Sequence, residues 1–88
     1  MRVDGHLCES WDDMEHPGDF HFVQGGLVFK CPCGCDDTLG VNFERPNEPK
    51  WTWDGNRGCP TVTPSIRRLS GCRWHGFLTA GSFTGQCE

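Results

Sequence analysis

Long apolar runs are missing from this 88-residue chain. No stretch approaches the roughly 20 apolar residues that a membrane-spanning helix requires, so we expect a soluble protein with no membrane partner. The first 20 residues are polar and acidic, where a secretory signal would need a basic start followed by an apolar segment. We therefore expect the protein to act in the cytoplasm, where cysteines stay reduced.

Aliphatic and basic residues are also scarce. Hydrophobic residues make up 35% of the sequence, while 12 glycines and 6 prolines limit regular structure further. A chain of this length forms one domain with a thin core, which usually needs disulfides, a metal or an oligomer for stability. The net charge of −4 argues against nucleic acid as a partner, because nucleic-acid binding depends on neutralising phosphates.

Most of the negative charge lies near the start of the chain, where residues 1–19 contain six acidic residues and one arginine. We interpret residues 1–19 as an acidic N-terminal arm that is solvated, or alternatively docks on a basic partner. Within it, Leu7, Trp11 and Met14 have helical spacing, and Ser10 can cap a short turn that Pro17-Gly18 would end. Residues 20–88 are then expected to form a single β-rich metal-binding domain.

Short strands dominate the pattern after this arm. Gly25-Gly26 separates two strand-like segments, which predicts a β-hairpin that ends at Cys31. Alternation and extended dipeptides predict further strands. The expected segments are Asp19–Gln24, Leu27–Lys30, Thr38–Phe43, a strand with Trp51 and Trp53 on one face, Pro60–Pro64, Ser65–Leu69 and Phe77–Phe83. The predicted fold class is a small β-rich, metal-stabilised domain, zinc-ribbon-like or Rieske-like, with at most one short helix.

Seven cysteines offer the missing stabilisation. Two clusters have ligand spacing, Cys31-Pro32-Cys33-Gly34-Cys35 and Cys72-Arg73-Trp74-His75, and proline and glycine allow the first to bend around an ion. We predict a zinc site formed by Cys31, Cys33, Cys72 and His75, with Cys35 as the substitute for one of the first two. The other cysteines are Cys8, Cys59 and Cys87, expected to be free or packed, with a Cys59–Cys87 pair as an option. A disulfide framework is the competing interpretation of all seven.

An iron–sulfur cluster is the alternative cofactor. The segment from Cys72 to Phe77 resembles the second ligand box of Rieske proteins, in which Cys-x-x-His-Gly precedes an aromatic residue. Rieske centres also need a Cys-x-His box, and the first cluster here reads Cys-x-Cys. A cluster held by three cysteines and one histidine, as in the mitoNEET family, remains open.

The order of motifs between Lys30 and Phe83 is similar to a small zinc-binding domain family of unknown function. It combines Cys-Pro-Cys-Gly-Cys, a tryptophan-rich strand, the Pro-Thr-x-x-Pro-Ser-Ile element of residues 60–66, and Gly-Cys-x-x-His. That family occurs in phages and bacteria and is found with bacterial ubiquitin-like cassettes. The resemblance implies a zinc-binding domain that is phage-encoded or carried by a mobile element, and it implies no reaction.

For function, we favour a protein-interaction module that a zinc ion stabilises and that acts on a host or phage protein. Trp51, Trp53, Arg67 and Arg68 are the candidate partner-binding residues, because tryptophan and arginine are favoured interface anchors. The usual motifs of metalloproteases, deaminases and phosphate loops are missing, so we lean against an enzyme. Ser65 and nearby threonines can line a site, although proline-rich turns often carry such residues. The alternatives are a metalloenzyme with an open zinc position and an iron–sulfur or redox protein.

Overall fold

The computed structural model describes residues 2–44, 50–68 and 71–87, with the side chain of Cys87 outside the description. Strands dominate these residues, and the predicted small β-rich fold class is confirmed. The helical element among them is a single 3₁₀ turn, η1 (Trp11–Asp13). The strands are β1 (Arg2–Asp4), β2 (His6–Leu7), β3 (Asp19–Val23), β4 (Gly26–Lys30), β5 (Thr38–Asn42), β6 (Thr52–Trp53), β7 (Val62–Arg67), β8 (Trp74–Thr79) and β9 (Ser82–Cys87).

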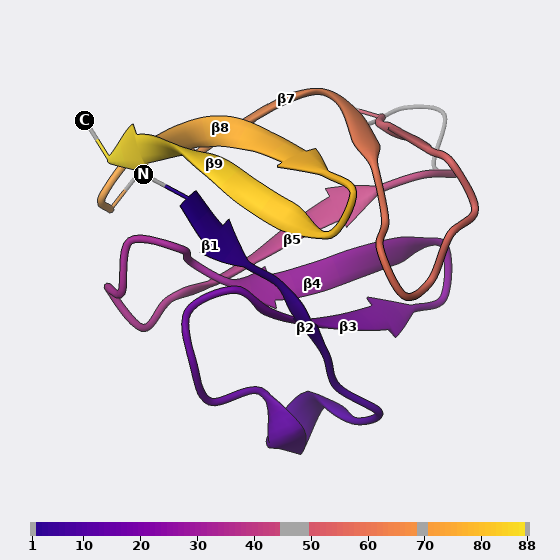
Figure 1. The fold of residues 1–88 in the computed structure, drawn as a ribbon, viewed down its shortest axis with the longest axis horizontal. Coiled ribbons are helices and arrows are strands. Elements are labelled where there is room, and N and C mark those ends of the chain that lie inside the picture. Colours follow the sequence, from indigo (N-terminus) through magenta and orange to yellow (C-terminus); the bar gives the residue numbers. More distant parts are fainter. Residues whose placement is uncertain (1, 45–49, 69–70, 88) are drawn as a thin grey trace.

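The strands form two sheets that face each other (Figure 1). One sheet has the order β1-β9-β8-β7-β6, and its neighbouring strands are antiparallel. The other has the order β2-β3-β4-β5, in which β2 runs parallel to β3 and the remaining pairs are antiparallel. Consecutive strands are therefore neighbours in most of the fold, which short turns make possible.

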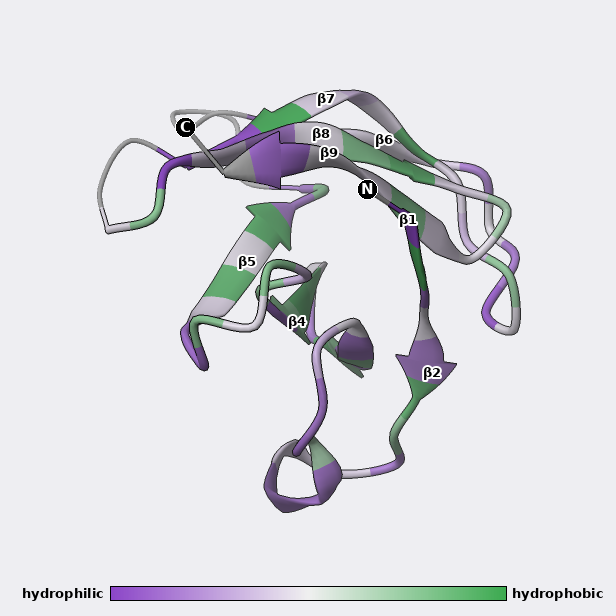
Figure 2. Ribbon diagram, turned by 60° about the vertical axis from the view of Figure 1, so that its left-hand side comes forward, coloured by the Kyte–Doolittle hydropathy of each residue, from purple (hydrophilic) through white to green (hydrophobic). Residues whose placement is uncertain are grey.

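The core fills the space between the two sheets. Phe20, Leu27 and Phe29 face it from one sheet, and Trp74, Leu78 and Phe83 face it from the other, all fully buried. Apolar and polar residues alternate along the strands, as the green and pale bands along β5 show (Figure 2). Because side chains on a strand point alternately to opposite faces, every second residue of β8 lies on the outer face of its sheet.

The predicted hairpin is present, with β3 and β4 joined through Gly25, which has a φ of 74°. Residues 38–42 form β5 as expected, and residues near Trp51 and Trp53 supply β6. The strand predicted over Phe77–Phe83 is wrong, because Ala80 and Gly81 have positive φ values and form a turn between β8 and β9. In the strand predicted over Ser65–Leu69, residues 65–67 belong to β7, and Leu69 lies outside the described residues.

The acidic segment at the start of the chain contributes two strands. β1 pairs with β9, and β2 pairs with β3, so the segment contacts both sheets. Gly5 lies between them and donates its N–H to the carbonyl of Gly81 at 2.7 Å. We expected these residues to form a solvated arm, but two short parts of the segment pair with strands. This pairing uses backbone hydrogen bonds, so it requires no apolar side-chain pattern that the sequence would display.

Candidate functional site

Two turns bring four thiols to one end of the sandwich. Cys31 directly follows β4, and the chain then bends, with Gly34 donating its N–H to the Cys31 carbonyl at 3.1 Å. Gly34 has a φ of 89°, a conformation that favours glycine. Cys72 follows Gly71, which has a φ of 64°, and precedes β8. The sequence therefore places the turn residues where each cluster must curve.

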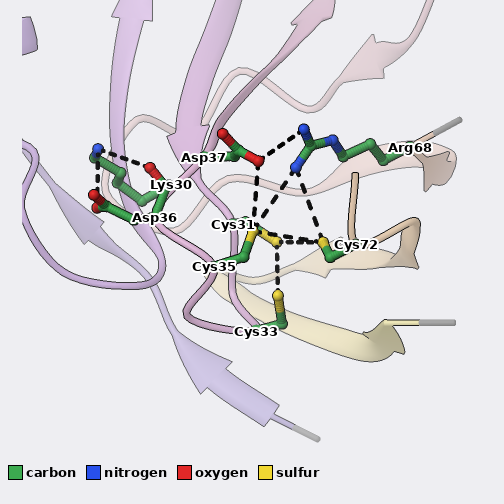
Figure 3. A network of polar contacts seen from close by, with 8 residues as sticks. All are labelled: Lys30, Cys31, Cys33, Cys35, Asp36, Asp37, Arg68 and Cys72. Carbon is green, nitrogen blue, oxygen red and sulfur yellow. Dashed lines mark hydrogen bonds and ion pairs between the residues drawn. The ribbon is translucent and has the colours of Figure 1, made fainter. Parts of the chain in front are cut away.

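The four sulfur atoms, those of Cys31, Cys33, Cys35 and Cys72, all lie within 4.8 Å of one another (Figure 3). Sγ–Sγ distances are 3.3 Å from Cys31 to Cys33, 3.4 Å from Cys31 to Cys72 and 3.5 Å from Cys35 to Cys72. Four thiolates on a tetrahedral zinc ion at about 2.3 Å lie about 3.8 Å apart. The donor set therefore fits one metal ion in size and in chemistry.

The electrostatics of the thiols depend on burial and on one arginine. Burial raises the pKa of the Cys31 thiol far above its ordinary value and also raises the pKa of Cys35. Arg68 forms an ion pair with Asp37 at 2.9 Å, and Nη1 of Arg68 lies 3.8 Å from the Cys35 sulfur and 3.9 Å from the Cys72 sulfur. The hydrogen bond to Asp37 raises the pKa of the guanidinium. A bound cation would favour the thiolate forms that burial alone disfavours.

Of the four ligands that the sequence analysis selected, the structure groups Cys31, Cys33 and Cys72, and it adds Cys35 to them. His75 is not in this group. Trp74 is fully buried in the core, so the next residue along β8 points to the opposite, outer face of the sheet. Cys72 lies on the core side of the same segment, which separates it from the imidazole of His75.

The His75 ring instead lies beside a serine of the neighbouring strand. Its Nε2 atom is 3.2 Å from Oγ of Ser65, and both residues are half-buried. β7 and β8 are antiparallel with Arg67 opposite His75, and their register shifts between Val62 and Ile66, the stretch that carries Ser65. A serine hydroxyl within hydrogen-bonding reach of an imidazole is the arrangement of an activated nucleophile and its base.

Trp51 links this pair to a cavity of about 400 Å³. Its indole Nε1 donates a hydrogen bond to the backbone carbonyl of Ser65 at 3.2 Å, and the same side chain lines the cavity. The other lining residues come from the β3–β4 hairpin and from β5, and they include Val28, Gly40 and Asn42. Ser65 is therefore connected through one indole ring to a surface hollow.

The four candidate partner-binding residues have different environments. Trp53 is half-buried, stacks on Phe43 with ring centroids 5.6 Å apart, and donates its indole N–H to the carbonyl of Asn56. Trp51 is also half-buried and packs against the core. Arg68 is engaged with Asp37 and the thiols, whereas Arg67 is exposed on the outer face opposite His75.

Cys8 and Cys59 are not part of the four-thiol group. Cys8 is buried and free, and Cys59 is exposed and free. The suggested Cys59–Cys87 pair involves a side chain outside the described residues. Sequence reasoning did not select Ser65 as a reactive group, although the Pro-Thr-x-x-Pro-Ser-Ile element was its best available signal.

Comparison with known protein families gives a match over most of the chain. The model of a family described as the bacterial ubiquitination-like system serine protease (BubE) matches residues 7–85. This match covers most of the chain, which therefore belongs to the BubE family. It agrees with the resemblance to a small domain found with ubiquitin-like cassettes. Neither a curated protein nor a solved structure gives a significant match. No helix in the described parts of the chain is long and apolar enough to cross a membrane.

Proposed function

We propose that this protein is a serine peptidase in which Ser65 is the nucleophile and His75 is the general base. The observation that carries the proposal is the 3.2 Å contact between Ser65 Oγ and His75 Nε2 on the outer face of the five-stranded sheet. The description of the BubE family as a serine protease supports the same reaction. The substrate we propose is a protein of the bacterial ubiquitination-like system.

The proposed reaction uses the two side chains in sequence. Ser65 Oγ bonds to the carbonyl carbon of the scissile peptide while Nε2 of His75 takes the hydroxyl proton. The C–N bond then breaks, and His75 passes that proton to the leaving amine. Water attacks the resulting ester with His75 as base, which releases the carboxylic acid and restores the Ser65 hydroxyl. A neutral imidazole whose proton is on Nδ1 has the tautomer that this sequence needs.

A protein substrate also requires a binding surface, and the outer face beside the pair offers one. Phe77 is two residues from His75 on the same face of β8 and is 50% exposed, which is high for a phenylalanine. Arg67 is exposed opposite His75. An aromatic ring and a guanidinium beside the nucleophile are typical anchors for a protein partner. The protein interaction that we inferred from the sequence would then be the recognition of the substrate.

We further propose that Cys31, Cys33, Cys35 and Cys72 hold a structural Zn²⁺ ion. Four sulfurs within 4.8 Å of one another suit one tetrahedral ion, whereas a two-iron cluster distributes its cysteine ligands over two metal atoms. The ion would connect the turn after β4 to the residue that precedes β8, the strand of His75. Its role is to hold the base-bearing strand in place, and no step of the reaction passes through it.

We also propose a cellular setting from the composition and the family resemblance. A site of reduced thiols suits the cytoplasm, where glutathione and thioredoxin keep cysteines reduced. A phage-encoded origin, with action in the host cytosol, is what the family resemblance implies.

The test is cleavage of a ubiquitin-like protein from such a system by the purified, reduced full chain. We expect a defined product in intact-mass spectra, and we expect Ser65→Ala to abolish it. Ser10→Ala is the matched control, because Ser10 is exposed and its side chain makes no capping hydrogen bond to η1. Stable binding of the ubiquitin-like protein with no product from the wild type would instead support a binding module without peptidase activity.

A further inference from the structure

A second group of potential metal ligands lies where β2 meets β3. His6, Cys8 and Asp19 each offer one ligand atom, and these three atoms lie within 4.8 Å of one another. Nδ1 of His6 is 3.9 Å from the Cys8 sulfur and 3.8 Å from Oδ1 of Asp19. Ligands on one tetrahedral zinc ion lie about 3.3–3.5 Å apart when one is sulfur and the others are nitrogen or oxygen. The three ligand atoms would therefore need to move only slightly towards one another to bind one ion.

Backbone structure holds two of these ligands in place. The parallel pairing of β2 and β3 puts His6 opposite Asp19, and Cys8 donates its N–H to the Phe20 carbonyl at 2.7 Å. Cys8 and Asp19 are each 5% exposed, so their side chains have little freedom. His6 is exposed and can turn its ring towards them. Two ligands are therefore preformed, and the third is exposed at the surface.

Asp19 is oriented in a way that leaves one oxygen for a cation. Its Oδ2 accepts hydrogen bonds from the backbone N–H groups of Glu15 at 3.0 Å and His16 at 2.9 Å. Its Oδ1 faces His6. Metal-binding carboxylates are commonly held by such additional hydrogen bonds, which fix the direction of the ligating oxygen.

The charge around this site also favours a cation. Four acidic residues surround the Cys8 thiol, namely Asp19, Asp13, Glu15 and Glu9. A divalent cation at the three ligand atoms would offset this excess of negative charge.

Few residues of the segment that the site would close are buried. Between Cys8 and Asp19, Met14 and Gly18 are buried, and most of the remaining residues are exposed. The only helical element there is the short turn η1. A metal bound to Cys8 and Asp19 would join the two ends of this loop.

We propose that His6, Cys8 and Asp19 form a second metal site, separate from the four-thiol group, that takes a divalent ion of the zinc class. One nitrogen, one sulfur and one oxygen form a donor set that zinc accepts, and three protein ligands leave one tetrahedral position to water. The site does not depend on the proposed peptidase activity, since it lies on β2, β3 and their connection rather than on β7 and β8.

The experiment compares zinc bound by the reduced full chain and by its variants, after metal removal and equilibrium dialysis against Zn²⁺ alone. His6→Ala removes an exposed ligand and should leave the fold intact. It should bind one zinc ion fewer per chain than the wild type. Its zinc affinity at this site should fall more than about 100-fold, which exceeds the loss expected when only a residue hydrogen-bonded to a ligand is removed. The matched control is His16→Ala, which removes another exposed imidazole and keeps the backbone N–H that Asp19 uses, and it should retain the wild-type stoichiometry.

The number of zinc ions per chain is compared between variants that all keep the four-thiol group. The difference therefore does not depend on what that group binds. Cobalt gives a second readout, since thiolate-to-cobalt absorbance should fall by the contribution of one thiolate in Cys8→Ser. Equal zinc content and affinity in the wild type and His6→Ala would overturn the proposal. Equal losses in His6→Ala and His16→Ala would overturn it too.

Discussion

Oγ of Ser65 and Nε2 of His75 lie 3.2 Å apart, although the two residues are ten positions apart and belong to different strands. The contact lies on the outer face of the five-stranded sheet, because Trp74 and Ile66, the residues adjacent to this pair, are buried in the core. The packing of the core therefore fixes which side chains of β7 and β8 meet on the outer face. A hydroxyl and an imidazole held in this way support nucleophilic chemistry.

The first prediction concerns the nucleophile. Replacing Ser65 with alanine should lower kcat/KM for peptide hydrolysis by at least about 1,000-fold, since removal of a nucleophile leaves only binding and electrostatic effects. The free energy of unfolding should change by less than about 1.5 kcal/mol, the range of one ordinary hydrogen bond. Kinetics and urea denaturation of the same preparation check both. A large loss of stability together with activity would indicate a structural role for Ser65.

The second prediction concerns the base. His75→Gln keeps a polar side chain of similar reach but cannot take up a proton, so hydrolysis should fall by about 100-fold or more. His16→Gln is the control, since His16 is exposed and its ring has no role in the proposed site. Comparison of kcat/KM for the two variants is the measurement. Equal activity in both would remove His75 from the reaction.

The third prediction tests the four-thiol metal site. Cys72→Ser should lose one zinc ion per chain and much of the folded population, because structural zinc contributes on the order of 10 kcal/mol to small domains. Cys59→Ser should keep both, since Cys59 is a free, exposed thiol away from the group. Metal analysis and circular dichroism of the two variants decide the outcome. Full zinc content in Cys72→Ser would show that the ligand set is different.

The fourth prediction assigns a positioning role to Trp51. Trp51→Phe keeps an aromatic ring but removes the indole donor to the Ser65 carbonyl, a hydrogen bond of about 0.5–1.5 kcal/mol. We expect kcat to fall by about 3- to 10-fold with KM unchanged, because the nucleophile is less well held. Trp53→Phe is the matched control, since its indole donates to Asn56 instead. A change in KM alone would mean that Trp51 contacts substrate and does not position Ser65.

Local patterns in the sequence predicted much of the fold. Alternation and Gly25-Gly26 defined the hairpin of β3 and β4, because both signals are contained in adjacent residues. The boundary between β8 and β9 was missed, since its turn is formed by Ala80 as well as Gly81, and alanine rarely adopts a positive φ. The pairing of β1 with β9 and of β2 with β3 was not predicted, because it depends mainly on backbone hydrogen bonds.

The candidate site was harder to predict than the fold. Cys72-x-x-His75 has the spacing of two ligands only if the chain between them stays in a turn. Here β8 begins at Trp74, whose burial directs His75 to the face opposite the thiols. The Ser65–His75 contact also depends on the pairing of β7 with β8, whose register no local spacing encodes. A serine near an imidazole in space leaves no fixed pattern in the sequence.

Covalent labelling with a fluorophosphonate tests directly whether Ser65 is a nucleophile that His75 activates. Attack by Ser65 Oγ on phosphorus would release fluoride and leave one phosphonyl group on the chain, which peptide mass spectrometry can locate. We expect a single adduct on Ser65 in the wild type, none in Ser65→Ala, and much slower labelling in His75→Gln. Absence of labelling in the folded wild type, or an adduct that persists in Ser65→Ala, would contradict this expectation.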